Sequence, residues 1–364
     1  MRIILFADKL PPNIGGMETH AHYFVKYFKN KFPLFIVSKN GDEDILVDYD
    51  YNFIKNIDLI DFLGQFSDEK IVLFFNSGRW IEELYDIKYV LSKAILIYRT
   101  GGNEIIKAPL NGNIENYEDR KTIWRNSIND NINYLITNSF FTEKRLIEFG
   151  INKKILKRVV GGVDKNVLAT AHKNREVTRE KYGIGMNDAL CVSSARFVEY
   201  KRPDFLIRAI SRCKTPLTLC FAGKGPLEEK TKELAQLSKV NICFLGNLSH
   251  DEAVCLIAAA DVYVQASTDL IKDVPGGSYI HTEGMGRSLL EAVCLGVPVV
   301  ITDCGAVGEY INESNGAIVN SEIEMAKAID KFLTNRKLLV ENTEKYTDLY
   351  SFEKIFEEYI LLWE

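Results

Sequence analysis

Two carboxylates flank a glycine turn in the segment HTEGMGRSLLEA at 281–292. Glu283 precedes the turn, Glu291 follows eight positions later, and Gly284 and Gly286 lie between them. Glycine lets a ligand approach the backbone closely, and carboxylates accept hydrogen bonds from hydroxyl groups. The pattern is typical of a site for a ligand that carries an anionic group and hydroxyls. An ordinary helix start with two surface glutamates gives the same pattern.

The apolar run after these glycines predicts a helix from about Arg287 to Leu295, with Gly296 as its stop. The first N–H groups of a helix have no partner within it, and the helix dipole attracts negative charge there. Such a helix start can hold a phosphate without a lysine. Glu291 falls about one turn into the helix, within reach of a hydroxyl of the same ligand.

A second candidate is the segment SSARFVEYKRPD at 193–204. Arg196 follows an apolar run that we expect to be a strand, and Lys201 comes five residues later, before a helix that begins near Pro203. Two cations in a loop after a strand can neutralise a diphosphate. Ordinary loop charge is the alternative interpretation.

Two further glycine turns follow expected strands. Gly15 and Gly16 open a helix after the first apolar run, which makes another turn able to bind an anion. In FAGKGP, Gly223 begins a G-x-G pattern, but Glu228 stands where a third glycine would complete the dinucleotide-binding fingerprint. This segment therefore predicts a tight turn and not a dinucleotide site.

The sequence offers no metal site and predicts no cofactor. His20 and His22 are two positions apart on an expected helix, so they face different ways and cannot form a simple metal pair. No H-E-x-x-H motif or His/Asp/Cys cluster is present. The seven cysteines form no C-x-x-C pair, and most lie in apolar runs, which favours reduced, buried thiols in a cytoplasmic protein.

Short apolar runs alternate with helical patterns along all 364 residues. Runs this hydrophobic are typical of parallel sheets covered by helices on both faces, and the alternation predicts an α/β fold with two doubly wound, Rossmann-like domains. The length also exceeds what one small core needs. The expected strands are 2–7, 34–38, 71–75, 94–98, 133–137, 157–160, 189–193, 217–222, 241–245, 262–265, 297–301 and 316–319.

The chain is nearly neutral in its first half, and the overall net charge of −5 comes from the second. A strongly basic nucleic-acid footprint is therefore absent. No segment approaches 18 uninterrupted apolar residues, which argues against a membrane span. The basic clusters KYFKNK at 26–31 and KKILKR at 153–158 leave a weak membrane-surface role open for the first half.

Together these segments resemble retaining nucleotide-sugar glycosyltransferases of the GT-B fold, specifically glycosyltransferase family 4. The resemblance covers nearly the whole chain, and each landmark is weak singly but they occur in the family's order. They are GGME at 15–18, ITNSFFTEKRL at 136–146, GGVD at 161–164, Arg196 with Lys201, GKGPLEE at 223–229, the E-x7-E element of Glu283 and Glu291, and EAVCLGVPVV at 291–300.

The resemblance implies a role for each matched residue. Arg196 and Lys201 bind the donor diphosphate and stabilise the leaving group, and Glu283 contacts a hydroxyl of the transferred sugar; these three are the expected catalytic residues. Glu291 binds the ribose. The other implied donor-binding residues are Gly15, Gly16, Gly223, Asn247, Leu248, Gly284, Met285, Gly286 and Arg287.

The resemblance also implies a division into domains that face one another across a cleft. Residues 1–165 form the acceptor-binding domain and residues 166–350 the nucleotide-sugar-binding domain. The amphipathic segment 351–364 is expected to cross back onto the first domain as a helix.

Two segments depart from the family's pattern. Many members carry a histidine near the transferred sugar, where this chain reads YRTGGNE at 98–104, so Arg99, Thr100 or Asn103 is expected to replace it. The segment 267–282 is longer than the usual turn and is expected to be a lid that shapes the sugar or acceptor site. His281 in that segment and His20 on the first helix are further candidate contacts for the sugar or the acceptor.

The resemblance implies transfer of a sugar from a nucleotide-diphosphate sugar, most simply a UDP- or GDP-sugar, with retention and without a metal. A saccharide or lipid-linked acceptor in bacterial surface polysaccharide or lipopolysaccharide assembly is expected, with no nucleic-acid partner. The protein would be cytoplasmic, with possible peripheral contact to the inner membrane through its first domain. A nucleotide-sugar epimerase, a phosphorylase-like enzyme and a non-catalytic sugar-nucleotide binder remain alternatives, whereas a glycosidase carboxylate pair is disfavoured because one glutamate is helical.

Overall fold

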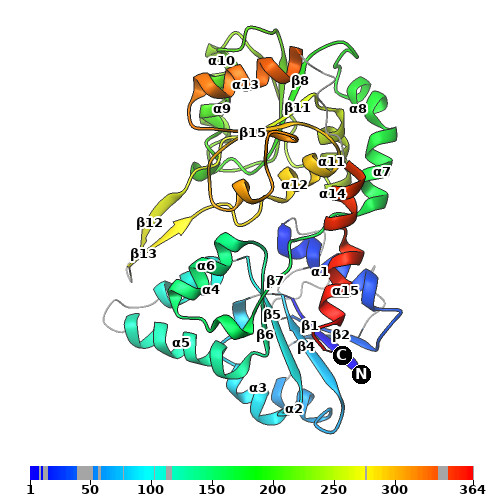
Figure 1. Cartoon of the computed structure of the whole chain (residues 1–364), viewed down its shortest axis with the longest axis vertical. Helices are drawn as coiled ribbons and strands as arrows, with labels where there is room; N and C mark the ends of the chain where they lie inside the picture. Colours follow the sequence, from blue (N-terminus) through cyan, green and yellow to red (C-terminus); the bar gives the residue numbers. More distant parts are fainter. Residues whose placement is uncertain are drawn as a thin grey trace. The chain divides into compact units, whose positions relative to one another are not determined.

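The computed structural model describes residues 1–7, 10, 15–38, 52–55, 59–76, 78–101, 103–111, 117–274, 277–334 and 343–363. Contacts divide the chain into two compact units (Figure 1). The first unit comprises residues 1–161, 271–280 and 352–364, and the second comprises 162–270 and 281–351.

The first unit is built on a seven-stranded parallel sheet in the order β3-β2-β1-β4-β5-β6-β7. Its strands are β1 (Arg2–Phe6), β2 (Leu34–Ser38), β3 (Asn52–Lys55), β4 (Ile71–Phe75), β5 (Ile95–Arg99), β6 (Tyr134–Thr137) and β7 (Leu156–Arg158). Its helices are α1 (Gly16–Phe28), α2 (Leu59–Gly64), α3 (Leu84–Val90), α4 (Asn103–Lys107), α5 (Tyr117–Asn131), α6 (Phe140–Phe149) and α15 (Phe352–Ile360).

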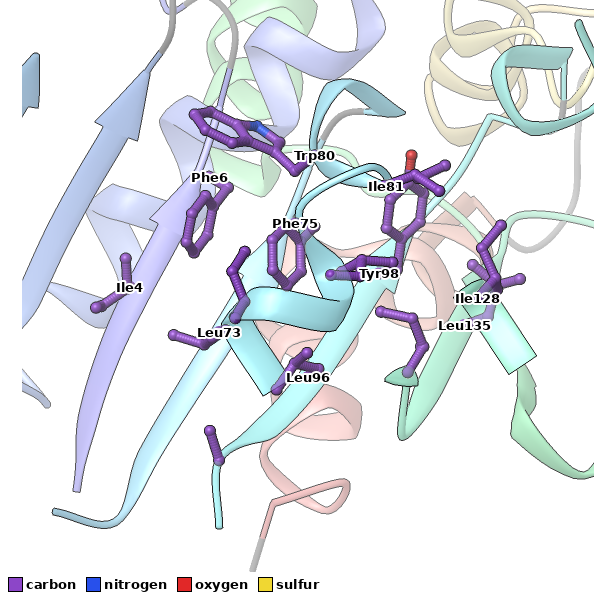
Figure 2. Close-up of a cluster of buried hydrophobic side chains, with 14 of the residues drawn as sticks. Ile4, Phe6, Leu73, Phe75, Trp80, Ile81, Leu96, Tyr98, Ile128 and Leu135 are labelled. Atoms are coloured by element: carbon purple, nitrogen blue, oxygen red, sulfur yellow. The ribbon is translucent and has the colours of Figure 1, made fainter. Parts of the chain in front are cut away.

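Side chains alternate between the two faces of this sheet, as the period of a strand requires. On β1, Ile4 and Phe6 enter one core, and the neighbouring residues Ile3 and Leu5 enter the other. Figure 2 shows the first of these cores, in which Phe6 stacks on Phe75 and meets the edge of Trp80. The central strand β4, IVLFF, is apolar at every position because both of its faces are covered.

Helix α15 completes the second of these cores. Phe356 packs against Phe24 and Phe28 of α1, and Tyr359 lies within the same cluster. The C-terminal segment therefore returns to the first unit, as the amphipathic pattern of 351–364 predicts.

The second unit is built on a six-stranded parallel sheet in the order β10-β9-β8-β11-β14-β15. Its strands are β8 (Leu190–Ser194), β9 (Thr218–Ala222), β10 (Asn241–Phe244), β11 (Val262–Gln265), β14 (Val299–Thr302) and β15 (Gly316–Val319). Its helices are α7 (Lys165–Lys173), α8 (Arg175–Lys181), α9 (Pro203–Ile210), α10 (Glu228–Leu237), α11 (His250–Ala259), α12 (Arg287–Cys294), α13 (Glu322–Thr334) and α14 (Thr343–Tyr350).

The expected domain division has boundaries after residues 165 and 350 and the observed units have them after 161 and 351, and the two also differ at one internal segment. A two-stranded hairpin, β12 (Leu270–Val274) and β13 (Gly277–His281), stands where a lid in the second domain was expected. Residues 271–280 are grouped with the first unit, because Tyr279 lies under the Lys107 ammonium and the carbonyl of Ile280 accepts a hydrogen bond from Arg145. The chain therefore enters the second unit near residue 162, leaves it for this hairpin, and leaves it again after residue 351.

We predict that truncation of the α15 anchor destabilises the first unit. Phe356→Ala removes a fully buried ring, which costs about 3–5 kcal/mol in the free energy of unfolding. Leu361→Ala is the matched control, because Leu361 is 73% exposed and its loss costs less than about 0.5 kcal/mol. Native-state hydrogen exchange at the amides of β1 and β4 measures the loss of stability in each variant. Equal protection in the two variants would show that α15 does not support the first unit.

Candidate active site

Lys201 and Glu283 form a buried ion pair in the second unit. Lys201 ends a single 3-10 turn, Glu199–Lys201, that follows β8, and its Nζ contacts Oε1 of Glu283. Only 13% of the lysine side chain and 7% of the glutamate side chain are exposed. Burial lowers the pKa of Lys201, but the charge and the hydrogen bond of Glu283 outweigh it, so that pKa lies above its ordinary value of 10.5. The lysine is therefore held as an ammonium.

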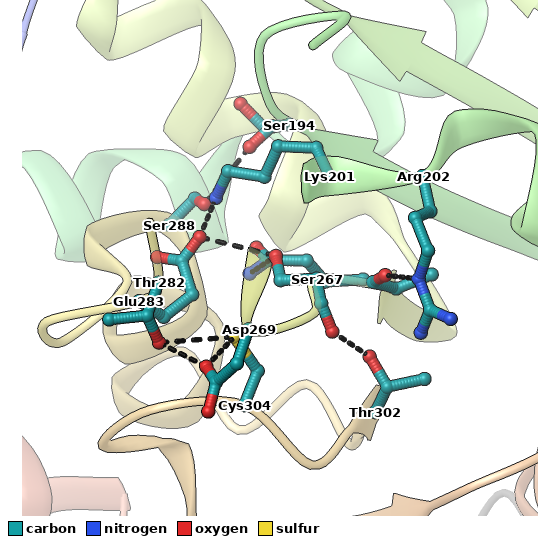
Figure 3. Close-up of polar contacts among 12 residues, drawn as sticks. Ser194, Lys201, Arg202, Ser267, Asp269, Thr282, Glu283, Ser288, Thr302 and Cys304 are labelled. Carbon is teal, nitrogen blue, oxygen red and sulfur yellow. Dashed lines mark hydrogen bonds and ion pairs between the residues drawn. The ribbon is translucent and has the colours of Figure 1, made fainter. Parts of the chain in front are cut away.

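Groups at the end of β11 hold the glutamate in place. The hydroxyl of Ser267 donates to Oε1 of Glu283 at 3.2 Å, and the amide of Gln265 donates to the Ser267 hydroxyl at 2.9 Å. Figure 3 shows Lys201 and Ser267 converging on the Glu283 carboxylate. Lys201, Gln265 and Ser267 lie at the carboxyl ends of the parallel strands β8 and β11, which is where open α/β sheets place their ligand sites.

The glycine turn after Glu283 opens helix α12 as the sequence predicts. Gly286 is the N-cap residue with φ of 75°, a left-handed conformation that favours glycine. A side chain at this position would lie about 3.5 Å from Oε2 of Glu283 and 3.4 Å from the Tyr310 hydroxyl. The hydroxyl of Ser288 donates to the carbonyl of Ser194 at 3.0 Å. The first turn of α12 is thus fastened to the end of β8, with its leading N–H groups beside the ion pair.

Glu291 lies within α12 and is held by two basic side chains. Nε2 of His250 lies 2.8 Å from Oε1 of Glu291, and Nη2 of Arg287 lies 3.4 Å from the same oxygen. Burial raises the pKa of Glu291, but His250 and Arg287 outweigh it, so the pKa falls below its ordinary value of 4.5. Glu291 is therefore a carboxylate at neutral pH. The stability that these partners contribute is complete above pH 4.5 and is lost as the pH falls through the lowered pKa.

Arg196 projects from the loop after β8, which backbone hydrogen bonds join to the loop after β9. The N–H of Phe197 donates to the carbonyl of Lys224 at 3.1 Å, and the N–H of Gly223 donates to the carbonyl of Gly246 at 2.7 Å. Gly223 is required, because a Cβ there would lie 2.2 Å from the carbonyl oxygen of Ala195. The Arg196 side chain is exposed on this rigid loop and forms no ion pair within the described part of the chain.

The comparisons with known proteins agree with this geometry. Residues 174–348 match the family model described as glycosyl transferases group 1. The match spans slightly less than half of the chain and includes Arg196, Lys201, Glu283 and Glu291. A GDP-mannose-dependent monoacylated alpha-(1-6)-phosphatidylinositol monomannoside mannosyltransferase of Corynebacterium glutamicum is 21% identical over 335 residues, which cover 87% of this chain and 84% of that protein.

Solved structures show that this glycosyltransferase has the GT-B fold. Anabaena Alr3699/HepE in complex with UDP-glucose superposes with a TM-score of 0.75 at 18% identity, covering 99% of this chain and 98% of that one. The lipopolysaccharide outer core galactosyltransferase WaaB superposes with a TM-score of 0.69 at 15% identity, covering 100% of this chain and 99% of that one.

The glycosyltransferase carries the remaining predicted site residues of its second unit near these loops. Gly284 and the buried Met285 lie in the turn before α12. Asn247 and Leu248 lie in the loop after β10, directly before the capping box of α11. His281 stacks on Tyr200 with ring centroids 4.1 Å apart, so it contacts the residue that precedes Lys201.

The candidate residues of the first unit lie around α1 and the end of β5. Gly15 and Gly16 begin α1, but His20 is buried in the core, where its Nε2 lies 3.1 Å from the Tyr359 hydroxyl. This contact fastens α1 to α15, which is a structural role.

The segment proposed to replace the family histidine is partly buried in the same unit. Nη1 of Arg99 lies 3.0 Å from the sulfur of Met17. Thr100 is fully buried and donates to Glu104 at 2.5 Å. The side chain of Asn103 lies outside the described residues.

Sequence reasoning missed His250 and the polar support of Glu283. Ser249 and Glu252 form a capping box at the start of α11. His250 lies two positions after Leu248, and nothing in the local sequence assigns a role to its side chain. Its partner Glu291 lies 41 residues away, so only the fold brings the two together.

The described residues show neither a metal-binding cluster nor a membrane-spanning helix. Within that part of the chain, no group of three or more His, Cys, Asp or Glu side chains is arranged to hold a metal ion. None of the described helices is long and apolar enough to cross a membrane.

We predict strong energetic coupling between Lys201 and Glu283. Lys201→Met and Glu283→Gln each leave a buried group without its partner, so each lowers the free energy of unfolding by about 3–5 kcal/mol. The double variant should lose much less than the sum of the two. Urea denaturation of the wild type, the two single variants and the double variant at pH 7 measures the coupling energy.

The control cycle uses Lys232→Met and Glu229→Gln on α10. Nζ of Lys232 lies 2.9 Å from Oε1 of Glu229, and these side chains are 36% and 82% exposed, so the control coupling should be much smaller. Additive losses in the Lys201–Glu283 cycle would contradict the ion pair.

Proposed function

We propose that this glycosyltransferase moves a sugar from a UDP- or GDP-sugar to a saccharide or lipid-linked acceptor with retention of anomeric configuration. Two comparisons support a nucleotide-sugar donor. The Anabaena neighbour was solved with UDP-glucose, and the Corynebacterium relative is named for its dependence on GDP-mannose. These two names differ in the base, so the class of nucleotide is a matter for experiment.

The observation that carries the proposal is the buried pair of Lys201 and Glu283 beside the start of α12. The two side chains suit opposite parts of one donor. A diphosphate takes the ammonium as its counterion and the leading N–H groups of the helix as donors. A sugar hydroxyl takes the carboxylate as its acceptor. Arg196, which is exposed on the loop after β8, adds the second cation.

The proposed reaction breaks the bond between the anomeric carbon and the departing phosphate oxygen, and it forms a bond from that carbon to the acceptor oxygen on the same face. Negative charge grows on the nucleoside diphosphate as it leaves. Lys201 and Arg196 stabilise that charge, and the acceptor's hydroxyl proton ends on the departing diphosphate. Glu283 holds the sugar through a hydroxyl. No metal is assigned to this mechanism.

Glu291 is proposed to bind the ribose of the donor. Its carboxylate is already ionised by His250 and Arg287, so it is ready to accept hydroxyl hydrogen bonds. The backbone of Asn247 and Leu248 is proposed to contact the base. His250 connects these two parts because it follows the loop in sequence and contacts Glu291.

The acceptor is proposed to bind the first unit, in bacterial surface polysaccharide or lipopolysaccharide assembly. The name of the WaaB neighbour supports the second of these settings. We further propose a cytoplasmic location with peripheral contact to the inner membrane through that unit. The exposed lysines of the cluster 26–31, Lys26, Lys29 and Lys31, support contact with anionic lipids.

We predict that one nucleoside diphosphate class raises the melting temperature in a panel of UDP-, GDP-, ADP- and TDP-sugars, because a ligand of the native state stabilises it. EDTA should leave the shift unchanged. With that donor and an acceptor panel, Glu283→Ala and Lys201→Ala should each lose about 10²–10³-fold in kcat. Lys232→Ala, on the surface of α10, is the control and should keep full activity.

Three results would each contradict a part of this proposal. Release of an altered sugar without any acceptor would identify an epimerase. A donor that binds and is never consumed across a broad acceptor panel would identify a non-catalytic binder. A thermal shift that EDTA abolishes would exclude a metal-free mechanism.

We predict that His250 acts on donor affinity and not on the chemical step. His250→Ala removes the 2.8 Å contact that orients Glu291, so the KM for the donor should rise about tenfold, or 1.4 kcal/mol, with kcat nearly unchanged. Leu237→Ala, at an exposed position at the end of α10, is the control. Steady-state kinetics decide, and a fall in kcat at constant KM would remove His250 from the ribose site.

A further inference from the structure

The hairpin β12–β13 is closed at its neck by one carboxylate. Asp269 directly precedes β12, and Thr282 directly follows β13. The Thr282 hydroxyl donates to Oδ1 of Asp269, which joins the two legs of the hairpin where they leave the second unit. Figure 3 shows these two side chains beside Cys304, below the Glu283 carboxylate.

The same oxygen of Asp269 also fixes the neck to the loop after β14. It accepts hydrogen bonds from the N–H of Gly305 at 3.1 Å and from the thiol of Cys304 at 3.2 Å. Burial raises the pKa of Cys304 to about 12, so this sulfur stays a thiol with a proton to donate. Three donors from two separate segments therefore meet at one carboxylate oxygen.

The hydrogen bonds to Asp269 involve Thr282, the residue before Glu283, and the same loop after β14 also fixes the backbone of Glu283. The carbonyl of Glu283 accepts a hydrogen bond from the N–H of Ala306 at 3.0 Å. Gly305 has a φ of 55°, and a Cβ there would lie 2.1 Å from the carbonyl oxygen of Glu283 and 2.5 Å from the Thr282 hydroxyl. The loop after β14 thus packs directly against the backbone that carries Glu283.

A second connection runs from the neck to Lys201. The N–H of Thr268, the residue before Asp269, donates to the carbonyl of Tyr200 at 2.8 Å. On the other leg, His281 stacks on the ring of Tyr200. Both legs of the hairpin therefore contact the residue that precedes Lys201 in the chain.

We propose that Asp269 is a positioning residue, which holds Glu283 against Lys201 by locking the neck of the β12–β13 hairpin to the loop after β14. The carboxylate acts through its hydrogen bonds to Thr282, Cys304 and Gly305, and not by contact with the donor. This inference rests on the proposed role of Glu283 at the transferred sugar. A displacement of Glu283 by about 1 Å is enough to cost about 10²-fold in rate, because reaction requires close alignment.

The proposal separates nucleotide binding from the chemical step. The diphosphate and ribose are assigned to Arg196, Lys201, Glu291 and the start of α12, none of which contacts Asp269. Asp269→Ala should therefore lower kcat for sugar transfer about 10–100-fold, while the affinities for UDP and GDP alone change less than about twofold. Asp269→Asn should recover kcat to within about threefold, because the amide oxygen can accept the same three hydrogen bonds.

Two further substitutions keep the test independent of one variant's folding. Thr282→Val removes the hydroxyl that closes the neck and should lower kcat as Asp269→Ala does, and Thr282→Ser, which keeps a hydroxyl, should not. Crystal structures of Asp269→Ala and Asp269→Asn supply a measurement that needs no activity. The contact between Lys201 and Glu283 should be lost in the first and kept in the second.

These experiments test the positioning role of Asp269 separately from the proposed glycosyl transfer. Equal losses of kcat in Asp269→Ala and Asp269→Asn would overturn it, because they would show that the charge itself acts on the substrate. An intact Lys201–Glu283 contact in the Asp269→Ala crystal, or wild-type kcat in that variant, would overturn it as well. If the wild type consumes no nucleotide sugar, the proposed function fails, and the two crystal structures still decide whether Asp269 positions Glu283.

Discussion

A charged pair removed from water is the constraint that organises the second unit. The desolvation of Lys201 and Glu283 opposes folding, and only their mutual attraction and additional hydrogen bonds offset it. Those bonds come from Ser267, at the end of β11, and through it from Gln265. Three segments, which follow β8, β11 and the β12–β13 hairpin, must therefore meet at one place for the pair to be stable. A protein that needed only stability could fill the same volume with apolar side chains, so the pair itself indicates a function.

The surrounding architecture explains how short loops achieve this convergence. Parallel strands bring all their carboxyl ends to one edge of the sheet, and the cores on the two faces fix the strands rigidly. Small side chains and glycines then bring the loops together, as Gly223 does against Ala195 and Gly305 does against Glu283. Each of these glycines stands where a Cβ would clash with backbone. The ligand-facing groups are therefore held by the backbone packing of the unit and not by flexible side chains.

Much of the fold and of the donor-facing site could be predicted from the sequence, because both depend on local patterns. The twelve expected strands are all present, since continuous apolar runs report burial on both faces. The helix after Gly286 was predicted because glycine and an apolar period mark its start. The strand β3 was missed because Asn52–Lys55 is short and not uniformly apolar. The sequence analysis assigns no strands to the segment 267–282, although LIKDV alternates and P-G-G follows it, which is a hairpin signal. The contacts of Asp269 and His250 had no local signal, because their partners are distant in the chain.

The route of the chain through its two units has a consequence for recombination between related enzymes. The backbone passes from one unit to the other after residues 161, 270, 280 and 351. A chimera made by a single crossover would thus combine the sheet of one parent with the hairpin and last helix of another. Donor and acceptor preferences could be exchanged cleanly only if residues 271–280 and 352–364 were transplanted together with 1–161. Exchange of a whole unit between related chains therefore requires three segments to change at once.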